Sequence, residues 1–590
     1  MSQEQVMNVQ SKKEGAQGIK LVWLMCIGIF LCMIDTTIMN IALPSIQQNL
    51  NVSLEKMSWV LNVYTMSIAV LAIPLGRFAE LFGRGKVYVG GLVIFCLGSL
   101  TCAMAVNGDM LIASRFIQSI GAAILLTSSF TIGVSAMPIE KRGVALSILG
   151  IMQGLSAAMG PTIGGIITQN LSWKWIFLVN VPFSIVALVL VIRMLNLRNE
   201  PRVKARIDWI GLVLSSTAIF TLTLSLIKGG TWGWGSGKSL TCYAVAVISL
   251  IVFILIERRL PYAMVNLKLF RDRFFVGSSL LMIVGNVFLI GVMVLLPTFL
   301  TRMMDKTEFA AALMVTPISF MIFLMAPIAS ALIRIFGKTV VIISGFALMG
   351  FSYYLLSHLG TASSVSEIVV ACLLLGTGYG LIVGPITVMS ASNFEGEMLA
   401  ASQSVIQMFR QVGMVLAISI FVALLTSNLK DSEANSLSYA KAQLDELKVD
   451  QTVKQNVTQR VQERINEQNV SVDNTGGKQE EAFVTPQERQ RLIDLNVEQQ
   501  LAKVPSGKRE AAKAAIVTAV TKKVDDNIKQ ITDTLTAYST KIKSYTVNAM
   551  ANSFASLYHF FMPFIFCFAL LGFIFVEKRV PVVREQQSKI

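Results

Sequence analysis

A series of fourteen apolar runs constrains the fold of this chain more than any other feature. About 20 predominantly apolar residues cross the hydrocarbon core of a bilayer as one helix. A membrane offers no water to backbone N–H and C=O groups, so segments of this length and polarity form helices. The runs cover residues 21–43, 57–76, 87–106, 110–136, 144–168, 176–196, 208–227, 240–256, 275–300, 309–333, 339–358, 365–388, 402–426 and 555–576. The sequence therefore predicts an all-α polytopic membrane protein with fourteen transmembrane helices.

Composition and charge agree with this class. Hydrophobic residues make up 54% of the chain and charged residues only 14%, whereas soluble domains are about 25% charged. The net charge of +15 follows the positive-inside rule, with 24 basic residues in the predicted cytoplasmic segments and 6 in the short outer loops. The positive charge therefore reflects topology, and we expect both termini to be cytoplasmic and no nucleic-acid partner. The seven cysteines have no metal-ligand spacing, so we expect no metal and no cofactor.

The apolar runs divide the chain into segments with different expected roles. We expect cytoplasmic tails, an N-terminal six-helix bundle, two inserted linker helices, a C-terminal six-helix bundle in two pieces, and an extracytoplasmic insertion between those pieces. The tails are residues 1–20 and 577–590, and the N-terminal bundle is 21–196. The linker helices occupy 208–256. The C-terminal bundle is 275–426 with 555–576, and the insertion is 427–553.

The polar segment 427–553 interrupts the series of spans. It holds 18 basic and 17 acidic residues, and its aliphatic residues recur at helical spacing, as in Ile516, Val520 and Val524. Thr485 and Pro486 are typical of a helix start, and residues 505–507 of a break. We predict a helical hairpin or small bundle outside the membrane, with its last helix continuing into the final span. The alternative is a flexible charged loop.

The most informative single residue is Asp35, inside the first apolar run. An ionisable side chain at bilayer depth costs at least about 2.5 kcal/mol, so it indicates a substrate or proton pathway. Asn40 follows it on the same run, before Pro44. The alternative is an aspartate at a helix end that reaches water. We predict that Asp35 is a proton or cation site.

The cytoplasmic turn after the second run combines glycines with charges: Gly76, Glu80, Gly83, Arg84 and Lys86. Glycines allow two helices to approach closely, and the acid can pair with the basic residues across a moving interface. The alternative is an ordinary positively charged inner loop. We predict a conformational-switch loop.

A degenerate copy of this turn lies one half-chain later. Aligning Gly83 with Gly337 also aligns Phe82 with Phe336, although Arg334 then stands in place of Glu80. Such an internal echo is typical of transporters built from repeated halves.

Arg115 is the basic residue that we expect inside the membrane, in the fourth run. Arg115 and Gln118 are three residues apart and therefore share a helix face. A buried guanidinium needs an acidic or carbonyl partner, and Asp35 is the best intramembrane candidate. The alternative is an arginine held near the outer surface by Asp109.

The fifth run carries the string Gly160-Pro161-Thr162-Ile163-Gly164-Gly165. Proline removes a backbone donor and kinks a helix, while glycines permit close helix packing. The alternative to a functional motif is a simple packing device. We place Gly160, Pro161, Gly164 and Gly165 at the wall or gate of a substrate cavity, together with Asn40 and Gln118.

These strings together resemble the major facilitator superfamily, and in combination its fourteen-helix drug:proton antiporter branch. The resemblance runs from about residue 20 to 430 and returns at 555–580. It implies two six-helix bundles that expose a central cavity alternately to each side. In the superfamily's antiporters, the arginine matching Arg115 is implicated in proton transfer. The Gly160-Pro161 string resembles a motif typical of antiporters rather than uptake symporters.

Substrate class is the least determined property. Arg410 in the thirteenth run adds a positive charge, with a cavity role or a packing role open. Many Met and Phe residues suit a deformable apolar cavity. We predict proton-coupled export of lipophilic drugs or other amphiphilic compounds by a monomer in the cell membrane, with protons, membrane lipids and a small-molecule substrate as partners. Doubly cationic substrates are disfavoured.

Three other functions remain to be weighed. One is an exporter or flippase of an endogenous lipid on the same fold. Another is a membrane scaffold or sensor that acts through the segment 427–553. An enzyme is disfavoured because only His358 and His559 occur and no nucleophile–base pair or phosphate-binding loop is present in the sequence.

Overall fold

The computed structural model describes residues 3–138, 142–195, 208–260, 265–390, 396–447 and 486–575, with a few single positions between them. Across these ranges the chain forms helices and turns and no strand, as predicted. The α-helices are α1 (Gln3–Leu50), α2 (Leu54–Phe82), α3 (Arg84–Ala103), α4 (Gly108–Ser135), α5 (Arg142–Asn170), α6 (Trp175–Leu178), α7 (Asn180–Met194), α8 (Trp209–Trp232), α9 (Gly237–Glu257), α10 (Arg273–Arg302), α11 (Glu308–Phe336), α12 (Lys338–Leu356), α13 (Val365–Met389), α14 (Gly396–Glu446), α16 (Pro486–Ala502) and α17 (Arg509–Ala569).

Each predicted span corresponds to helix in the structure. Twelve helices are long and apolar enough to cross a membrane, or thirteen when α2, which bends by 51° at Pro74, is counted as one span. Pro74 explains the bend because proline removes a backbone donor and clashes with the preceding turn. Helix α5 covers the remaining predicted run, 144–168. The polytopic all-α fold is therefore confirmed, while the count of fourteen stays a prediction.

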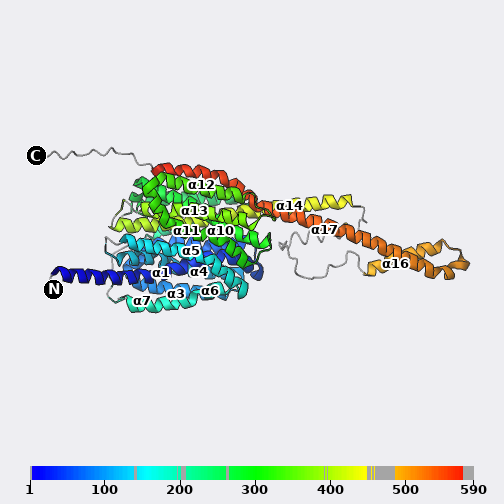
Figure 1. Cartoon of the computed structure of the whole chain (residues 1–590), viewed down its shortest axis with the longest axis horizontal. Coiled ribbons are helices and arrows are strands. Elements are labelled where there is room, and N and C mark those ends of the chain that lie inside the picture. Colours follow the sequence, from blue (N-terminus) through cyan, green and yellow to red (C-terminus); the bar gives the residue numbers. More distant parts are fainter. Residues whose placement is uncertain are drawn as a thin grey trace. The chain divides into compact units, whose positions relative to one another are not determined.

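The chain divides into two compact units. The membrane unit contains Met1–Thr301, Lys306–Ser427 and Phe554–Ile590. Its helices lie side by side with roughly parallel axes (Figure 1). Helix α1 packs against α4, α5 and α7, and α11 packs against α12 and α13. Helices α5 and α11 also pack against each other, so they join the first half of this unit (α1–α7) to its second half (α10–α14 with the end of α17).

The turns that connect α2 to α3 and α11 to α12 are alike, as the sequence echo predicts. Gly83 separates α2 from α3 with a φ of 105°, and Gly337 separates α11 from α12 with a φ of 84°. Residues other than glycine rarely adopt such angles. The same abrupt junction therefore recurs at equivalent places in the two halves.

The insertion unit contains Arg302–Asp305 and Asn428–Ser553. The predicted helical spacing is present: Ile516, Val520, Val524 and Ile528 of α17 pack with Ile493 of α16. A second cluster joins the end of α14 to α17 through Leu444, Leu535, Tyr538 and Ile542. Helix α17 runs on into the final apolar run, also as predicted. Over the described part, the flexible-loop alternative is wrong, while Thr485 lies outside the described residues.

One ion pair lies in the insertion unit at the α16–α17 contact. The Arg489 guanidinium donates two hydrogen bonds to the Asp525 carboxylate, at 2.7 and 2.8 Å. Hydrogen bonding to Arg489 holds the pKa of Asp525 below its usual range. Both side chains are partly exposed to solvent, so water screens the pair and it contributes little to stability.

Candidate functional site

Asp35 and Arg115 form an ion pair in the interior of the membrane unit. Arg115 Nη1 donates to Asp35 Oδ2, and the two side chains are 1% and 0% exposed. Asp109 instead pairs with Lys56 at 2.7 Å, so the alternative in which Asp109 holds Arg115 is wrong. Because Asp35 is 1% exposed, the alternative in which it reaches water at a helix end is also wrong. Breaking such a pair leaves one buried charge uncompensated.

Two side-chain amides complete the shell around Asp35. Gln118 Nε2 and Asn180 Nδ2 each donate to Asp35 Oδ1 at 2.9 Å. Both amides also donate to Ser99 Oγ at 3.2 Å. Ser99 Oγ in turn donates to the Phe177 carbonyl oxygen at 2.8 Å. We call Asp35, Arg115, Gln118, Asn180 and Ser99 the Asp35 network.

The guanidinium of Arg115 is held on a second side by aromatic rings. It lies 3.9 Å from the centre of the Tyr64 ring and 5.8 Å from that of Phe177. Arg115 Nη1 also donates to Gln118 Oε1 at 2.8 Å. A cation over a ring face is stabilised by the ring quadrupole, most strongly when water is excluded. The network therefore holds one positive and one negative charge without solvent.

Glycines set the close packing that brings these residues together. A side chain added at Gly98 of α3 would lie 2.5 Å from the backbone of Gln118 on α4, and one at Gly121 would collide with α3 at Phe95. Without side chains at these positions, the two helices touch through their backbones. Ser99, the neighbour of Gly98, thereby reaches the amide of Gln118.

The predicted glycines of α5 act in the same way. A side chain at Gly160 would collide with Thr37 of α1, and one at Gly164 would lie 2.8 Å from Ile38. Gly165 faces the other half, where an added side chain would lie 2.6 Å from Ala312 of α11. Pro161 is buried. This string therefore lies between Asp35's helix and the second half of the membrane unit.

Arg410 also contacts the opposite half. Its Nη1 atom donates to Gln153 Oε1 of α5 at 3.0 Å. Asn62 of α2 donates to Ser419 of α14 at 3.1 Å. Polar side chains of the first half thus bond directly to α14. Arg410 makes no contact with the Asp35 network among the interactions of the described residues.

The predicted switch loop has an internal ion pair. Arg84 Nη2 lies 3.4 Å from Glu80 Oε1 across the junction of α2 and α3. A side chain at Gly83 or Gly85 would collide with the carboxylate of Glu200. Gly76 has open space around it and Lys86 is exposed. A further acid, Glu200, therefore lies against this junction, which the sequence analysis did not predict.

Asn40 lies on α1 five residues beyond Asp35 and is 5% exposed. It makes no hydrogen bond with the Asp35 network, which among the described residues contains Asp35, Arg115 and Gln118 of the predicted site residues.

Comparison with known proteins decides the family. The family model described as Major Facilitator Superfamily matches residues 25–418, about two thirds of the chain. The chain belongs to the Major Facilitator Superfamily. It is therefore a multi-pass membrane protein of a transporter family, as the motif resemblance implied.

Relatives of the chain include proteins named for multidrug transport, for drug resistance and for export. The chain is 28% identical to the multidrug transporter protein MdtP of Bacillus subtilis over 71% of this chain and 78% of the relative. It is 29% identical to multidrug resistance protein 3 of Bacillus subtilis over 67% and 77%. It is 28% identical to the tetracenomycin C resistance and export protein of Streptomyces glaucescens over 69% and 75%.

Solved structures agree on the fold. An auto-inhibited peptide transporter of the POT family superposes with a TM-score of 0.54 at 13% identity, over 76% of this chain and 95% of that protein. A D-xylose–proton symporter gives a TM-score of 0.50 at 13% identity, over 69% and 90%. At this identity the likeness concerns the superfamily's fold alone.

Three members of the site of this superfamily protein were missed by sequence reasoning: Ser99, Asn180 and Tyr64. Asn180 stands just before Val181-Pro182 in an otherwise apolar run. A polar amide inside a span is a usable signal. Ser99 and Tyr64 carry no such signal, because serine and tyrosine are common in membrane helices.

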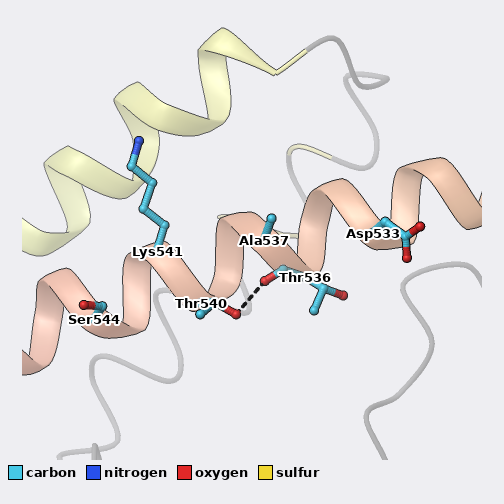
Figure 2. Close-up of a pocket in the computed structure, with 6 residues that line it drawn as sticks. All are labelled: Asp533, Thr536, Ala537, Thr540, Lys541 and Ser544. Atoms are coloured by element: carbon cyan, nitrogen blue, oxygen red, sulfur yellow. Dashed lines mark hydrogen bonds between the residues drawn. The ribbon is translucent and has the colours of Figure 1, made fainter.

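A surface groove lies in the insertion unit, on one face of α17. Its lining residues are Asp533, Thr536, Ala537, Thr540, Lys541 and Ser544 (Figure 2). Lys541 extends from this face to Gln443 of α14. The groove is open, its lining residues all belong to α17, and none of them is a predicted site residue. We therefore place the candidate site at the Asp35 network, which contains the buried ion pair of Asp35 and Arg115.

Proposed function

We propose that this protein exports lipophilic drugs or other amphiphilic compounds across the cytoplasmic membrane in exchange for protons, by alternating access. The buried pair of Asp35 and Arg115 carries the proposal. A charged side chain at bilayer depth costs free energy, so an acid at this depth indicates a substrate or proton pathway. The relatives named for multidrug transport and for drug resistance and export support drugs as the substrate class.

The proposed cycle alternates the charge of Asp35. Protonation from the outer side weakens the hold of Asp35 on Arg115 or on bound substrate and favours substrate release. Loss of the proton to the cytoplasm restores the carboxylate and recruits the next substrate. Arg115 and Gln118 remain bonded to each other at 2.8 Å and preserve the geometry for that return.

Movement of the two halves requires specific contacts to break. Asn62 with Ser419, Thr162 with Thr316 at 2.8 Å, and Arg410 with Gln153 each join a helix of the first half to one of the second. Each is a single hydrogen bond, worth about 0.5–1.5 kcal/mol net between the neutral groups and about 1.5–3 kcal/mol where Arg410 donates. Such bonds are strong enough to favour one state and weak enough to exchange.

The driving force suffices for export. One positive charge moving inward gains about 2.3 kcal/mol per 100 mV of membrane potential. Since about 1.4 kcal/mol corresponds to a factor of ten, this concentrates a neutral substrate outward roughly 40-fold. A pH gradient adds to this ratio.

The substrate cavity in this proposal lies between the halves. We assign to it Asn40, Gln118, the glycines and proline of α5, and Arg410. The positive charge of Arg410 favours neutral or singly charged amphiphiles over doubly cationic ones, because Asp35 is already paired with Arg115.

The experiment uses inverted membrane vesicles that contain the protein, an imposed pH gradient and a chemically diverse panel of lipophilic compounds. We expect at least one compound to accumulate in the vesicles and to release protons from them, detected with a pH-sensitive dye. A protonophore should abolish both signals. Accumulation that persists in the presence of the protonophore contradicts the proposal. Transport of a membrane lipid, with no transport of any compound of the panel, contradicts it as well.

The proposed topology puts the insertion unit outside the cell. Asp533 lies on an open face of α17, so Asp533→Cys offers a labelling site. A membrane-impermeant thiol reagent should label it in intact cells. Labelling that appears only after permeabilisation would reverse the orientation. The wild-type chain is the matched control for its own cysteines.

A further inference from the structure

The break in the sixth predicted span positions Asn180. Helix α6 ends at Leu178 and α7 begins at Asn180. Pro182 lies in the first turn of α7, where its missing N–H is tolerated. The bond from Ser99 to the Phe177 carbonyl oxygen, at 2.8 Å, braces the chain just before the break. Asn180 is 1% exposed, so its amide is fixed by protein contacts rather than by bulk water.

The Asp35 network is built for an ionised carboxylate. Asp35 receives N–H groups on both oxygens: Gln118 and Asn180 on Oδ1, and Arg115 on Oδ2. A carboxylate only accepts hydrogen bonds, whereas a carboxylic acid must also donate one. A proton on Oδ1 therefore faces two amide N–H groups and no acceptor. One donor has to turn away before the protonated acid is satisfied.

Asn180 is the member of the network that can turn with least loss. Arg115 has no acceptor atom to offer. Gln118 already uses its carbonyl oxygen to accept from Arg115 and from the Cys102 thiol. Within the described part of the chain, the side-chain carbonyl oxygen of Asn180 takes part in none of the network's hydrogen bonds. Rotating this amide thus presents an acceptor to Asp35 and gives up only bonds to Asp35 and Ser99.

We propose that Asn180 is a positioning residue for the proton site: its amide stabilises ionised Asp35 and turns its carbonyl oxygen toward Asp35 when the carboxyl group takes up a proton. This inference rests on the proton coupling proposed above. The added proton cancels the negative charge that faces Arg115. Arg115 keeps its hydrogen bond to Gln118 and its contact with the Tyr64 ring. Ser99 then loses the hydrogen bond from Asn180, next to the break between α6 and α7. The protonation state of Asp35 thereby changes the hydrogen bonds at this junction.

Two substitutions test this role. Asn180→Leu removes the donor, and Asn180→Asp keeps the shape of the side chain while replacing the donor by a second acid. Ser184→Ala is the matched control, since Ser184 is a buried polar residue of α7 whose hydroxyl, among the described residues, donates only to the Asn180 backbone carbonyl, at 2.7 Å. Each variant is assayed for proton-driven export in inverted vesicles over a range of pH, and for substrate exchange without a pH gradient.

The expected result is a displaced pH profile with exchange retained. Asn180→Leu should move the midpoint of proton-driven export upward by about one pH unit, because the hydrogen bond lost to the ionised carboxylate is stronger than the one lost to the protonated acid. Asn180→Asp should move it further, since a neighbouring carboxylate disfavours ionisation. Ser184→Ala should keep the wild-type profile.

Other results overturn the inference in distinguishable ways. A wild-type pH profile in both Asn180 variants, with export abolished in Asp35→Asn, rejects the role of Asn180 alone. Retained proton-driven export in Asp35→Asn rejects the proposed function and this inference with it. Loss of gradient-free exchange in folded Asn180→Asp would assign Asn180 to the substrate path instead. If Asn180→Leu does not fold, the isosteric aspartate variant carries the test.

Discussion

The two halves of the membrane unit share a helix junction but fill the space behind it with different chemistry. Ser99 follows Gly83 by sixteen residues in the first half, and Tyr353 follows Gly337 by sixteen in the second. Ser99 belongs to the Asp35 network, whereas Tyr353 donates to the Phe288 carbonyl oxygen at 2.6 Å. The Tyr353 ring packs edge-on against Tyr558 and Phe288, with centroids 5.5 and 5.9 Å away.

The difference shows which half of a repeated fold offers the hydrogen-bond partners that an acid needs if it is to change its protonation state. Charges that must change protonation need several donors and acceptors directed at one point, and the first half supplies them from four helices. The second half supplies aromatic packing, which stabilises without responding to pH. A similar backbone in the two halves therefore carries a network of buried charged and polar side chains in one and aromatic packing in the other, according to the side chains at equivalent positions.

The sharpest way to break this comparison is Asp35→Asn. We expect proton-driven export to be abolished, because the amide cannot gain or lose the proton, while the protein still inserts and folds. Vesicle transport under a pH gradient measures the effect, and size-exclusion chromatography checks folding. Undiminished proton-coupled flux would remove the proton site from the first half.

Arg115→Ala should have the next largest effect. It leaves Asp35 charged and unpaired in a dry site, which costs about 3–5 kcal/mol, so we expect little transport and a lowered melting temperature. Arg115→Lys should restore transport only in part, because an ammonium cannot donate to Asp35 and Gln118 in the same fork geometry. Normal transport in both variants would make Arg115 a packing residue.

Arg410→Gln tests whether the positive charge of Arg410, in the second half, acts in proton coupling or in substrate binding. Glutamine can still bond to Gln153, but it lacks the positive charge. We expect transport to fall several-fold, through a raised substrate concentration for half-maximal rate, with an unchanged pH profile. Initial rates measured at several substrate concentrations and two pH gradients separate these effects. A displaced pH profile would place coupling in both halves.

Tyr353→Phe should have the smallest effect. It removes one buried hydrogen bond, worth about 0.5–1.5 kcal/mol, and keeps the ring contacts with Phe288 and Tyr558. We expect a slightly lower melting temperature in detergent and transport close to wild type. A loss of proton-driven export would show that the aromatic core also takes part in coupling.

The fold was largely predictable because helix formation in a membrane depends on local properties. Apolar length set the helices, the glycine echo at Gly83 and Gly337 indicated the repeat, and the spacing of Ile516, Val520 and Val524 predicted the packing in the insertion unit. The pairing of Asp35 with Arg115 followed from the cost of an unpaired charge. The exact number of spans stays a prediction, and so do the roles of the site residues.

By itself the sequence determined the helices, the buried charges and the residues that share a face of one helix, such as Arg115 and Gln118. Only the tertiary structure decided that Asn180, 145 residues from Asp35 in the chain, donates to the same carboxylate oxygen as Gln118. It likewise placed Ser99 between the two amides and Tyr64 under the guanidinium. The physical reason is that periodicity reports the face of a helix, whereas hydrogen bonds between helices depend on their rotation and separation, which glycines such as Gly98 and Gly121 set through backbone contact.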